Sequence, residues 1–124
     1  MSSESLHEAP EKLSPATIDR HRATVSLMEE LEAIDWYDQR IDAAADDTLR
    51  AILRHNRDEE KEHAAMVLEW LRRQDSVLDQ QLRTYLFKDG DIMTVEVDAE
   101  AGGSGNPNEG CLGIGDLRSE EVAP

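Results

Sequence analysis

The sequence predicts an all-α protein built from a two-helix antiparallel hairpin and a short third helix. Proline is absent between Pro15 and Pro107, and the stretch from about 15 to 88 is rich in Ala, Leu, Glu, Arg and Gln, which favour helices. All seven glycines stand at Gly90 or later, so the helical part is expected to end near that residue. Only 39% of the 124 residues are hydrophobic, which is enough for one small domain with a thin core.

Each helix has a recognisable beginning. Ser14 precedes a proline, the combination of a capping side chain and a first helical residue that opens a helix over about 15–45. The polar run 46–48 then supplies a turn and a new cap for a second helix over about 48–75, and a shorter third helix follows over about 76–88. The first two helices are each roughly 40 Å long and, joined by a tight turn, are expected to pack antiparallel.

The ends of the chain differ in composition from this helical part. We expect a flexible N-terminus over 1–13, a helical domain over 14–90, a flexible linker over 91–111 and a terminal motif region over 112–124. The apolar residues of the last region are Leu112, Ile114 and Leu117. A glycine-rich linker that ends in such a group is typical of a motif presented to a partner, and we expect this tail to be disordered in the isolated chain.

Charge excludes several classes of function. The sequence has 13 basic and 28 acidic residues, a net charge of −15, so phosphate backbones and anionic membranes would repel it. No apolar stretch is long enough to span a membrane, and the N-terminus lacks the apolar segment of a secretion signal. The single cysteine, Cys111, cannot form an internal disulfide. We therefore expect a soluble, cytoplasmic protein whose natural partners are cations and basic surfaces.

Ionisable residues interrupt the stripe that each long helix is expected to bury. Spacings of four and three trace the first stripe as Ala23, Leu27, Glu30, Ile34, Tyr37 and Ile41. The second stripe is Leu49, Leu53, Asn56, Glu60, His63, Val67 and Trp70. Burial of an unpaired carboxylate costs several kcal/mol, so the glutamates and histidine at the centre need compensation.

The three central residues are expected to meet. Glu30 precedes the turn near Asp46 by 16 residues, and Glu60 and His63 follow it by 14 and 17, which places all three roughly 21–26 Å from the bend. Two carboxylates and an imidazole are suited to iron or manganese, and less selectively to zinc. The alternative is a hydrated polar layer that only fixes the register of the helices. The matching height on two helices favours a metal site.

The chain carries half of a known arrangement. Ferritin-like di-iron bundles use one Glu from each of two helices and a Glu-x-x-His from each of the other two. This sequence has one such Glu, one Glu-x-x-His and two long helices. Together they make half of a ferritin-like four-helix bundle. A two-fold dimer would complete both the bundle and the di-metal centre, since symmetry supplies a second Glu30, Glu60 and His63.

Three runs of residues resemble the encapsulated ferritins. They are His21 to Tyr37 with Met28-Glu29-Glu30-Leu31-Glu32-Ala33 inside it, His55 to Trp70, and Arg83-Thr84-Tyr85-Leu86-Phe87. The resemblance covers about 12–88. It implies a half-ferritin that assembles as a ring-shaped decamer, a pentamer of dimers, with a ferroxidase centre at a dimer interface.

The resemblance also implies roles for individual residues. The ferroxidase ligands would be Glu30, Glu60 and His63, with Tyr37 beside them as a partner of the ligands. A metal-entrance site, where calcium or another divalent cation is a candidate, would comprise Glu29, Glu32 and Trp36. We assign no metal to His7, His21 and His55, which lie off the central level, or to Glu59 and Glu62, which fall on the outer face.

The tail completes the resemblance. Leu112–Arg118 is similar to the peptide by which such cargo docks inside an encapsulin shell, although Asp116 stands where family peptides usually have Ser. The expected function is oxidation of Fe(II) by dioxygen inside an encapsulin nanocompartment that stores the iron. Two alternatives stay open. One is a rubrerythrin-like di-iron peroxidase, for which a rubredoxin-type cysteine set is absent. The other is a non-enzymatic helical adaptor.

Overall fold

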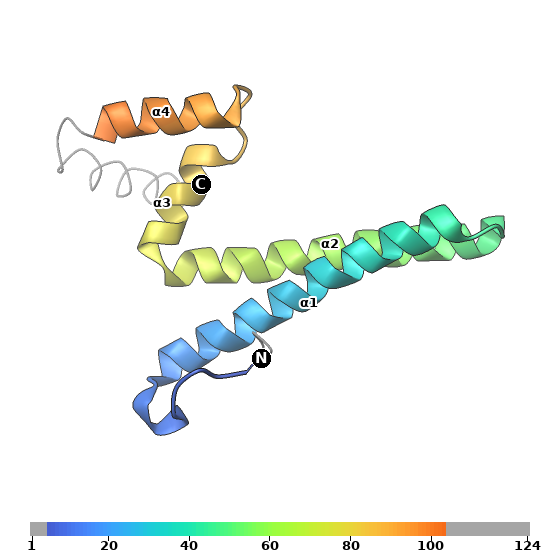
Figure 1. Cartoon of the computed structure of the whole chain (residues 1–124), viewed down its shortest axis with the longest axis horizontal. Helices are drawn as coiled ribbons and strands as arrows, with labels where there is room; N and C mark the ends of the chain where they lie inside the picture. The colour runs from blue at the N-terminus through green and yellow to red at the C-terminus, as the bar shows by residue number, and fades with distance from the viewer. Residues whose placement is uncertain (1–4, 104–124) are drawn as a thin grey trace, which may run out of the picture. The chain divides into compact units, whose positions relative to one another are not determined.

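The computed structural model describes residues 5–103. All regular secondary structure in this part of the chain is helical. A short 3-10 helix, η1 (Pro10–Lys12), precedes α1 (Pro15–Ala43), α2 (Asp47–Gln74), α3 (Ser76–Tyr85) and α4 (Ile92–Gly103) (Figure 1). No strand occurs between residues 5 and 103, and the all-α prediction is confirmed. None of these helices is long and apolar enough to cross a membrane.

The chain divides into two compact units where the sequence predicted one helical domain over 14–90. The first unit ends at Asp75, the C-cap residue that follows α2, and the second begins at Ser76. Asp75 has an extended backbone, with φ −141° and ψ 107°, so the helical path is interrupted there. The hairpin and the later helices are therefore described separately.

The predicted caps set the limits of the hairpin in the first unit. The hydroxyl oxygen of Ser14 accepts a hydrogen bond from the N–H of Thr17 at 3.1 Å, and Pro15 occupies the first position of α1. The carboxylate of Asp46 accepts one from the N–H of Leu49 at 2.7 Å and opens α2. Each cap satisfies a backbone donor that the helix itself leaves free, a contribution of about 1 kcal/mol.

The core between α1 and α2 is thin. The buried apolar residues of the hairpin are Ile41, Ala64 and Leu71. All six positions of the first predicted stripe are buried or half-buried, but the second stripe is exposed at its ends, where Leu49 is 47% and Trp70 39% exposed. A straight helix turns every 3.6 residues, so a stripe drawn at 3.5 drifts by about 20° per heptad and leaves the contact line at its ends.

The two helices of the hairpin lie together near their connection and separate toward the start of α1 and the end of α2 (Figure 1). An ion pair between Arg57 and Asp38 links the two helices directly, with a nitrogen of Arg57 3.0 Å from a carboxylate oxygen of Asp38. Large apolar side chains stay exposed on the hairpin: Met28, Leu31, Trp36, Leu49, Ile52, Met66 and Trp70. A hairpin with this little core and this much exposed apolar surface is what half of a helical bundle provides.

In the second unit, α3 ends three residues before the predicted limit. The N–H of Leu86 still donates to the carbonyl of Leu82 at 2.8 Å, but Phe87 has φ 59°, in the left-handed region where the helix cannot continue. Within α3, the buried carboxylate of Asp79 accepts a hydrogen bond from Arg83 at 3.0 Å. The pairing compensates the burial of this charge.

Helix α4 lies where the sequence predicted the start of a flexible linker over 91–111. Asp91 caps it, since its carboxylate accepts a hydrogen bond from the N–H of Thr94 at 3.2 Å. Residues 92–101 contain no glycine or proline, so the helix can extend until the Gly102-Gly103 pair, a composition typical of a helix end. The remainder of the predicted linker and the motif region 112–124 lie outside the described residues.

Candidate metal centre

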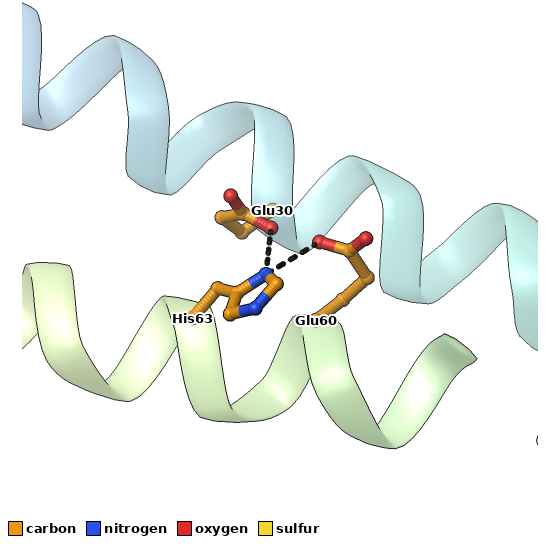
Figure 2. Close-up of side chains that lie close together, drawn as sticks. All are labelled: Glu30, Glu60 and His63. Atoms are coloured by element: carbon orange, nitrogen blue, oxygen red, sulfur yellow. Dashed lines mark ion pairs between the residues drawn. The ribbon is translucent and has the colours of Figure 1, made fainter. Parts of the chain in front are cut away.

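The three central residues of the predicted stripes converge between α1 and α2. The Nδ1 atom of His63 lies 3.7 Å from Oε2 of Glu30 and 3.4 Å from Oε2 of Glu60. One ligand atom from each residue falls within 4.8 Å of the others. Figure 2 shows the three side chains pointing toward one another, Glu30 from α1 and the other two from α2. Among the described residues, this is the only such group of three His, Cys, Asp or Glu side chains.

The spacing of residues on α2 and the register of the hairpin together produce this convergence. Glu60 and His63 are three residues apart on α2 and so project from the same side of that helix. Glu30 reaches them from the facing helix because the tight connection holds both helices in the register that the sequence predicted. The cluster is partly open: the side chain of His63 is 42% exposed and those of the two glutamates 24% each.

The electrostatics of the cluster favour a cation. The pKa of Glu30 is raised above its usual value, first because its carboxyl shares a hydrogen bond with that of Glu60, then because of partial burial and of the negative charge of Glu60. His63 acts in the opposite direction and lowers it, but does not cancel the effect. Two carboxylates at this distance resist being charged together, and a metal ion between them would remove the repulsion.

The donor set fits a first-row metal. Two carboxylate oxygens and one imidazole nitrogen suit iron, manganese or zinc better than calcium or magnesium, which prefer oxygen donors alone. Three protein donors leave further coordination positions to be filled by water, substrate or a second protein chain. The cluster can therefore bind a metal, and one chain does not saturate it.

The other residues assigned by resemblance lie outside the cluster. Tyr37 is half-buried on α1, seven residues beyond Glu30, with the guanidinium carbon of Arg40 5.5 Å from its ring centroid. The residues of the proposed entrance are exposed on the same helix: Glu29, Glu32 and Trp36. They have the solvent access that an entrance requires, and none of them belongs to the cluster formed by the three central residues.

The residues to which the sequence analysis assigned no metal lie outside the metal cluster. Glu59 and Glu62 are exposed, and Glu59 lies 3.4 Å from Nε2 of the exposed His55. His7 is exposed and His21 half-buried, and neither belongs to the cluster. Cys111 and Leu112–Arg118 lie outside the described residues.

The structure also contains a feature that sequence reasoning missed, an open groove of about 290 Å³ between α1 and α2. Its lining is mostly apolar and comprises Arg22, Ala23, Ser26, Met66, Val67 and Trp70. We call it the α1–α2 groove. Its only sequence signal is the pairing of the small residues Ala23 and Ser26 with large residues of α2 at the same height.

Comparison with known proteins identifies the family. A family model described as EncFtn-like matches residues 5–89, well over half of the chain. The chain belongs to this EncFtn-like family. The matched span contains the whole hairpin, α3 and the Glu30, Glu60 and His63 cluster, so the resemblance to encapsulated ferritins predicted from the sequence is confirmed.

Individual proteins are similar to this chain over different shares of its length. An encapsulated ferritin-like protein of Rhodospirillum rubrum is 57% identical over 128 residues, covering 96% of this chain and 91% of that protein. The crystal structure of protein ne0167 from Nitrosomonas europaea superposes with a TM-score of 0.69 at 56% identity, covering 71% of this chain and 97% of that one. The encapsulin nanocompartment cargo protein EncC of Myxococcus xanthus is 38% identical over 66 residues, about half of each chain.

Proposed function

We propose that this EncFtn-like chain is a ferroxidase, which takes Fe(II) as its substrate and oxidises it to Fe(III) with dioxygen. The observation that carries the proposal is the convergence of Glu30, Glu60 and His63, with the Nδ1 atom of the histidine within 3.7 Å of both carboxylates. The donor chemistry matches the half-site of a ferritin-like di-iron centre.

The active unit is a pair of chains. A two-fold axis beside the cluster would bring two copies of each ligand together, so that four carboxylates and two imidazoles surround two iron ions. The partial exposure of the cluster supports this, because a second chain can reach it directly. The thin core supports it as well, because the exposed apolar side chains of the hairpin gain a partner in the same step.

The residues of each half-site have distinct tasks. Glu30 and the neutral imidazole of His63 would each be a ligand to one of the two iron ions. Glu60 would bridge the two iron ions. Anionic oxygen donors stabilise Fe(III) over Fe(II), since the higher charge gains more from them. The two Fe(II) ions would together give two electrons to dioxygen, which with two protons from solvent becomes hydrogen peroxide.

The acidic surface would supply the substrate. Glu29 and Glu32 are exposed on α1 on either side of Glu30, and the chain as a whole carries a net charge of −15, so Fe(II) is attracted toward the cluster. With Trp36 these residues would form the entrance site, which calcium or another divalent cation could also occupy. Tyr37, on the buried side of the helix, would assist the ligands.

The site of action would be an encapsulin nanocompartment in the cytoplasm. The names of the Rhodospirillum rubrum and Myxococcus xanthus relatives describe encapsulated proteins or encapsulin cargo. In this chain Leu112–Arg118 would dock on the shell, and the ferroxidase would assemble as a decameric ring of dimers. Oxidised iron would be stored in the shell, because a half-bundle encloses no mineral cavity.

Aerobic addition of Fe(II) with near-ultraviolet absorbance tests the activity. The wild type should oxidise Fe(II) well above the buffer rate, and E60A or H63A should lose at least tenfold. E62A is the matched control, because Glu62 is an exposed carboxylate between the two ligands, and this variant should keep the parent rate. Oxidation at the buffer rate by the wild type would leave the adaptor alternative, and a strong preference for peroxide over dioxygen would favour the peroxidase.

A further inference from the structure

A thioether stands one helical turn from the metal cluster. Met66 follows His63 by three residues on α2, so the two side chains project from neighbouring positions on one side of that helix, with about 5–6 Å between their Cβ atoms. Met66 is 57% exposed, so its sulfur is not shielded within the hairpin. An oxidant that forms at the cluster therefore has a methionine directly beside it.

The α1–α2 groove continues from the cluster past this methionine. Met66 and Val67, the residues three and four positions beyond His63, line the groove, and Trp70 lines it one further turn along α2. The side chain of His63 is 42% exposed, so the cluster is open to solvent as well. A small molecule that moves from the cluster into the groove along α2 meets the thioether before it meets the indole.

The proposed reaction would produce an oxidant at this place. Two Fe(II) ions that reduce dioxygen by two electrons leave one molecule of hydrogen peroxide at the cluster. Iron that cleaves the O–O bond of peroxide generates short-lived oxidants, which react close to where they form. Methionine is oxidised readily to its sulfoxide by such species. The thioether nearest to the iron is then the expected target.

We propose that Met66 is a site of oxidative modification, at which hydrogen peroxide that reacts with iron at the cluster converts the thioether to the sulfoxide. The proposal rests on the proposed function, which supplies both the iron and the peroxide. The sulfur gives up two electrons and forms one S–O bond, while the O–O bond of the peroxide breaks. The second oxygen leaves as water and carries both protons of the peroxide.

The modification changes the chemistry of the groove. A sulfoxide is polar and accepts hydrogen bonds, whereas the thioether that it replaces is apolar like Ala23 and Val67 on the same lining. Each event also removes one peroxide molecule, which is then no longer free to react with Trp70 or with further Fe(II). Met66 therefore takes up oxidant at the point where the groove begins.

Met28 is an internal control in the same hairpin. It precedes Glu30 by two residues on α1, which turns its side chain about 160° away from that ligand. Met28 is 36% exposed and Met66 57%, so a reagent that attacks from solvent should favour Met66 by less than about threefold. A much larger preference indicates an oxidant that starts at the cluster.

Peptide mass spectrometry of the full-length chain measures this preference. The protein receives several additions of one Fe(II) per chain in air, with catalase present to destroy peroxide that reaches the solvent. We expect the sulfoxide fraction at Met66 to exceed that at Met28 at least tenfold. Reagent hydrogen peroxide added without iron or catalase should give a ratio below about threefold.

Two pairs of variants locate the source of the oxidant and its target. E60A should lose the preference for Met66, because a ligand is removed, whereas the exposed neighbour variant E62A should keep it. The double variant A65M/M66L moves the thioether about 100° around α2 at nearly the same height, from a position beside His63 to the far side of the helix. Its sulfoxide fraction under iron turnover should fall at least fivefold below that of the wild type.

Three results would overturn the proposal. Equal sulfoxide at Met66 and Met28 during iron turnover would mean that the oxidant acts from solvent, and so would complete protection of Met66 by catalase. An unchanged preference in E60A would mean that the iron responsible is bound elsewhere. An unchanged sulfoxide fraction in A65M/M66L would mean that the side of α2 does not matter.

A separate arm distinguishes this inference from the proposed function. Fe(II) and one equivalent of hydrogen peroxide are added together without oxygen or catalase, so that the oxidant does not depend on the reaction with dioxygen. A tenfold preference for Met66 in this arm, in a chain that oxidises no Fe(II) in air, would support the modification site and reject the ferroxidase. Fast oxidation of Fe(II) in air with equal sulfoxide at the two methionines would reject the modification site and leave the ferroxidase.

Discussion

Replacing Glu30 by Gln should stabilise the metal-free protein and weaken its response to metal. The amide has almost the shape of the carboxyl but carries no charge, so the repulsion from Glu60 is lost while the packing of α1 against α2 is kept. A residue that only fixes the register of the helices would give the opposite result, since its loss would destabilise the hairpin in either state.

The distances in the cluster set the size of the effect. Two unit charges 4.8 Å apart, the outer limit for the ligand atoms, repel by about 1 kcal/mol in water and by about 3.5 kcal/mol at an effective dielectric constant of 20. The two glutamate side chains are 24% exposed, which places the repulsion near the lower value. At pH 8, where an imidazole is neutral, we expect a gain of about 1 kcal/mol, or roughly 3–5 °C in Tm.

The pH dependence gives this prediction a second readout. The pKa of Glu30 is raised, so the carboxyl stabilises the folded state fully only when protonated, below its ordinary value of 4.5, and that contribution is lost as pH rises through the raised pKa. The advantage of E30Q over the wild type should therefore be largest at pH 8 and shrink toward pH 4.5. Differential scanning calorimetry with a chelator present measures both.

Addition of metal should reverse the order of the two proteins. Zn(II), which oxygen does not oxidise, should raise the Tm of the wild type and shift that of E30Q much less. E29Q is the matched control, because Glu29 is the exposed neighbour of Glu30, and its Tm and metal response should follow the wild type. A lower Tm for metal-free E30Q, together with an unchanged response to Zn(II), would refute the assignment of Glu30 as a ligand.

Three further predictions concern other parts of the chain. Two arginines hold the carboxylate of Glu69 and lower its pKa to about 2, so E69Q should lose about 0.5 kcal/mol in urea unfolding at pH 7, a difference that closes as pH falls from 4.5 to about 2. The double variant E29A/E32A should slow Fe(II) uptake several-fold in stopped-flow absorbance, because the acidic entrance is lost while the centre remains. Deletion of residues 112–124 should leave the oxidation rate unchanged and abolish loading into a co-expressed encapsulin.

Each of these has an outcome that would contradict it. A pH-independent effect of E69Q would mean that its charge does not act on the arginines. Loss of metal binding in E29A/E32A would make these residues ligands rather than an entrance, and the parent uptake rate would remove the entrance altogether. Normal loading of the truncated chain would place the docking site in the helical part.

The sequence was sufficient for the hairpin because its signals are local. The serine and aspartate caps, the absence of proline and the spacing of the stripe residues act within a few turns of helix, and counting residues from the turn was enough to bring Glu30 to the height of His63. The drift of the second stripe was missed, because it depends on how two straight helices cross. Helix α4 was missed because a glycine-rich composition further along the chain was extended back over residues that can form a helix.

The groove could not have been predicted from the sequence. It exists because α1 and α2 separate toward the open end of the hairpin, and the separation is set by the packing of the whole pair rather than by any run of residues. The roles proposed for Tyr37 and for the entrance residues would likewise depend on a second chain.

Native mass spectrometry under anaerobic Fe(II) tests the two-chain centre most directly, because it counts chains and metal ions in the same species. We predict two iron ions in each dimer or higher assembly of dimers, none in the monomer, and loss of both ions from the H63A dimer. A monomer that binds one iron and oxidises it at the full rate once oxygen is admitted would contradict a centre shared between two copies of the hairpin.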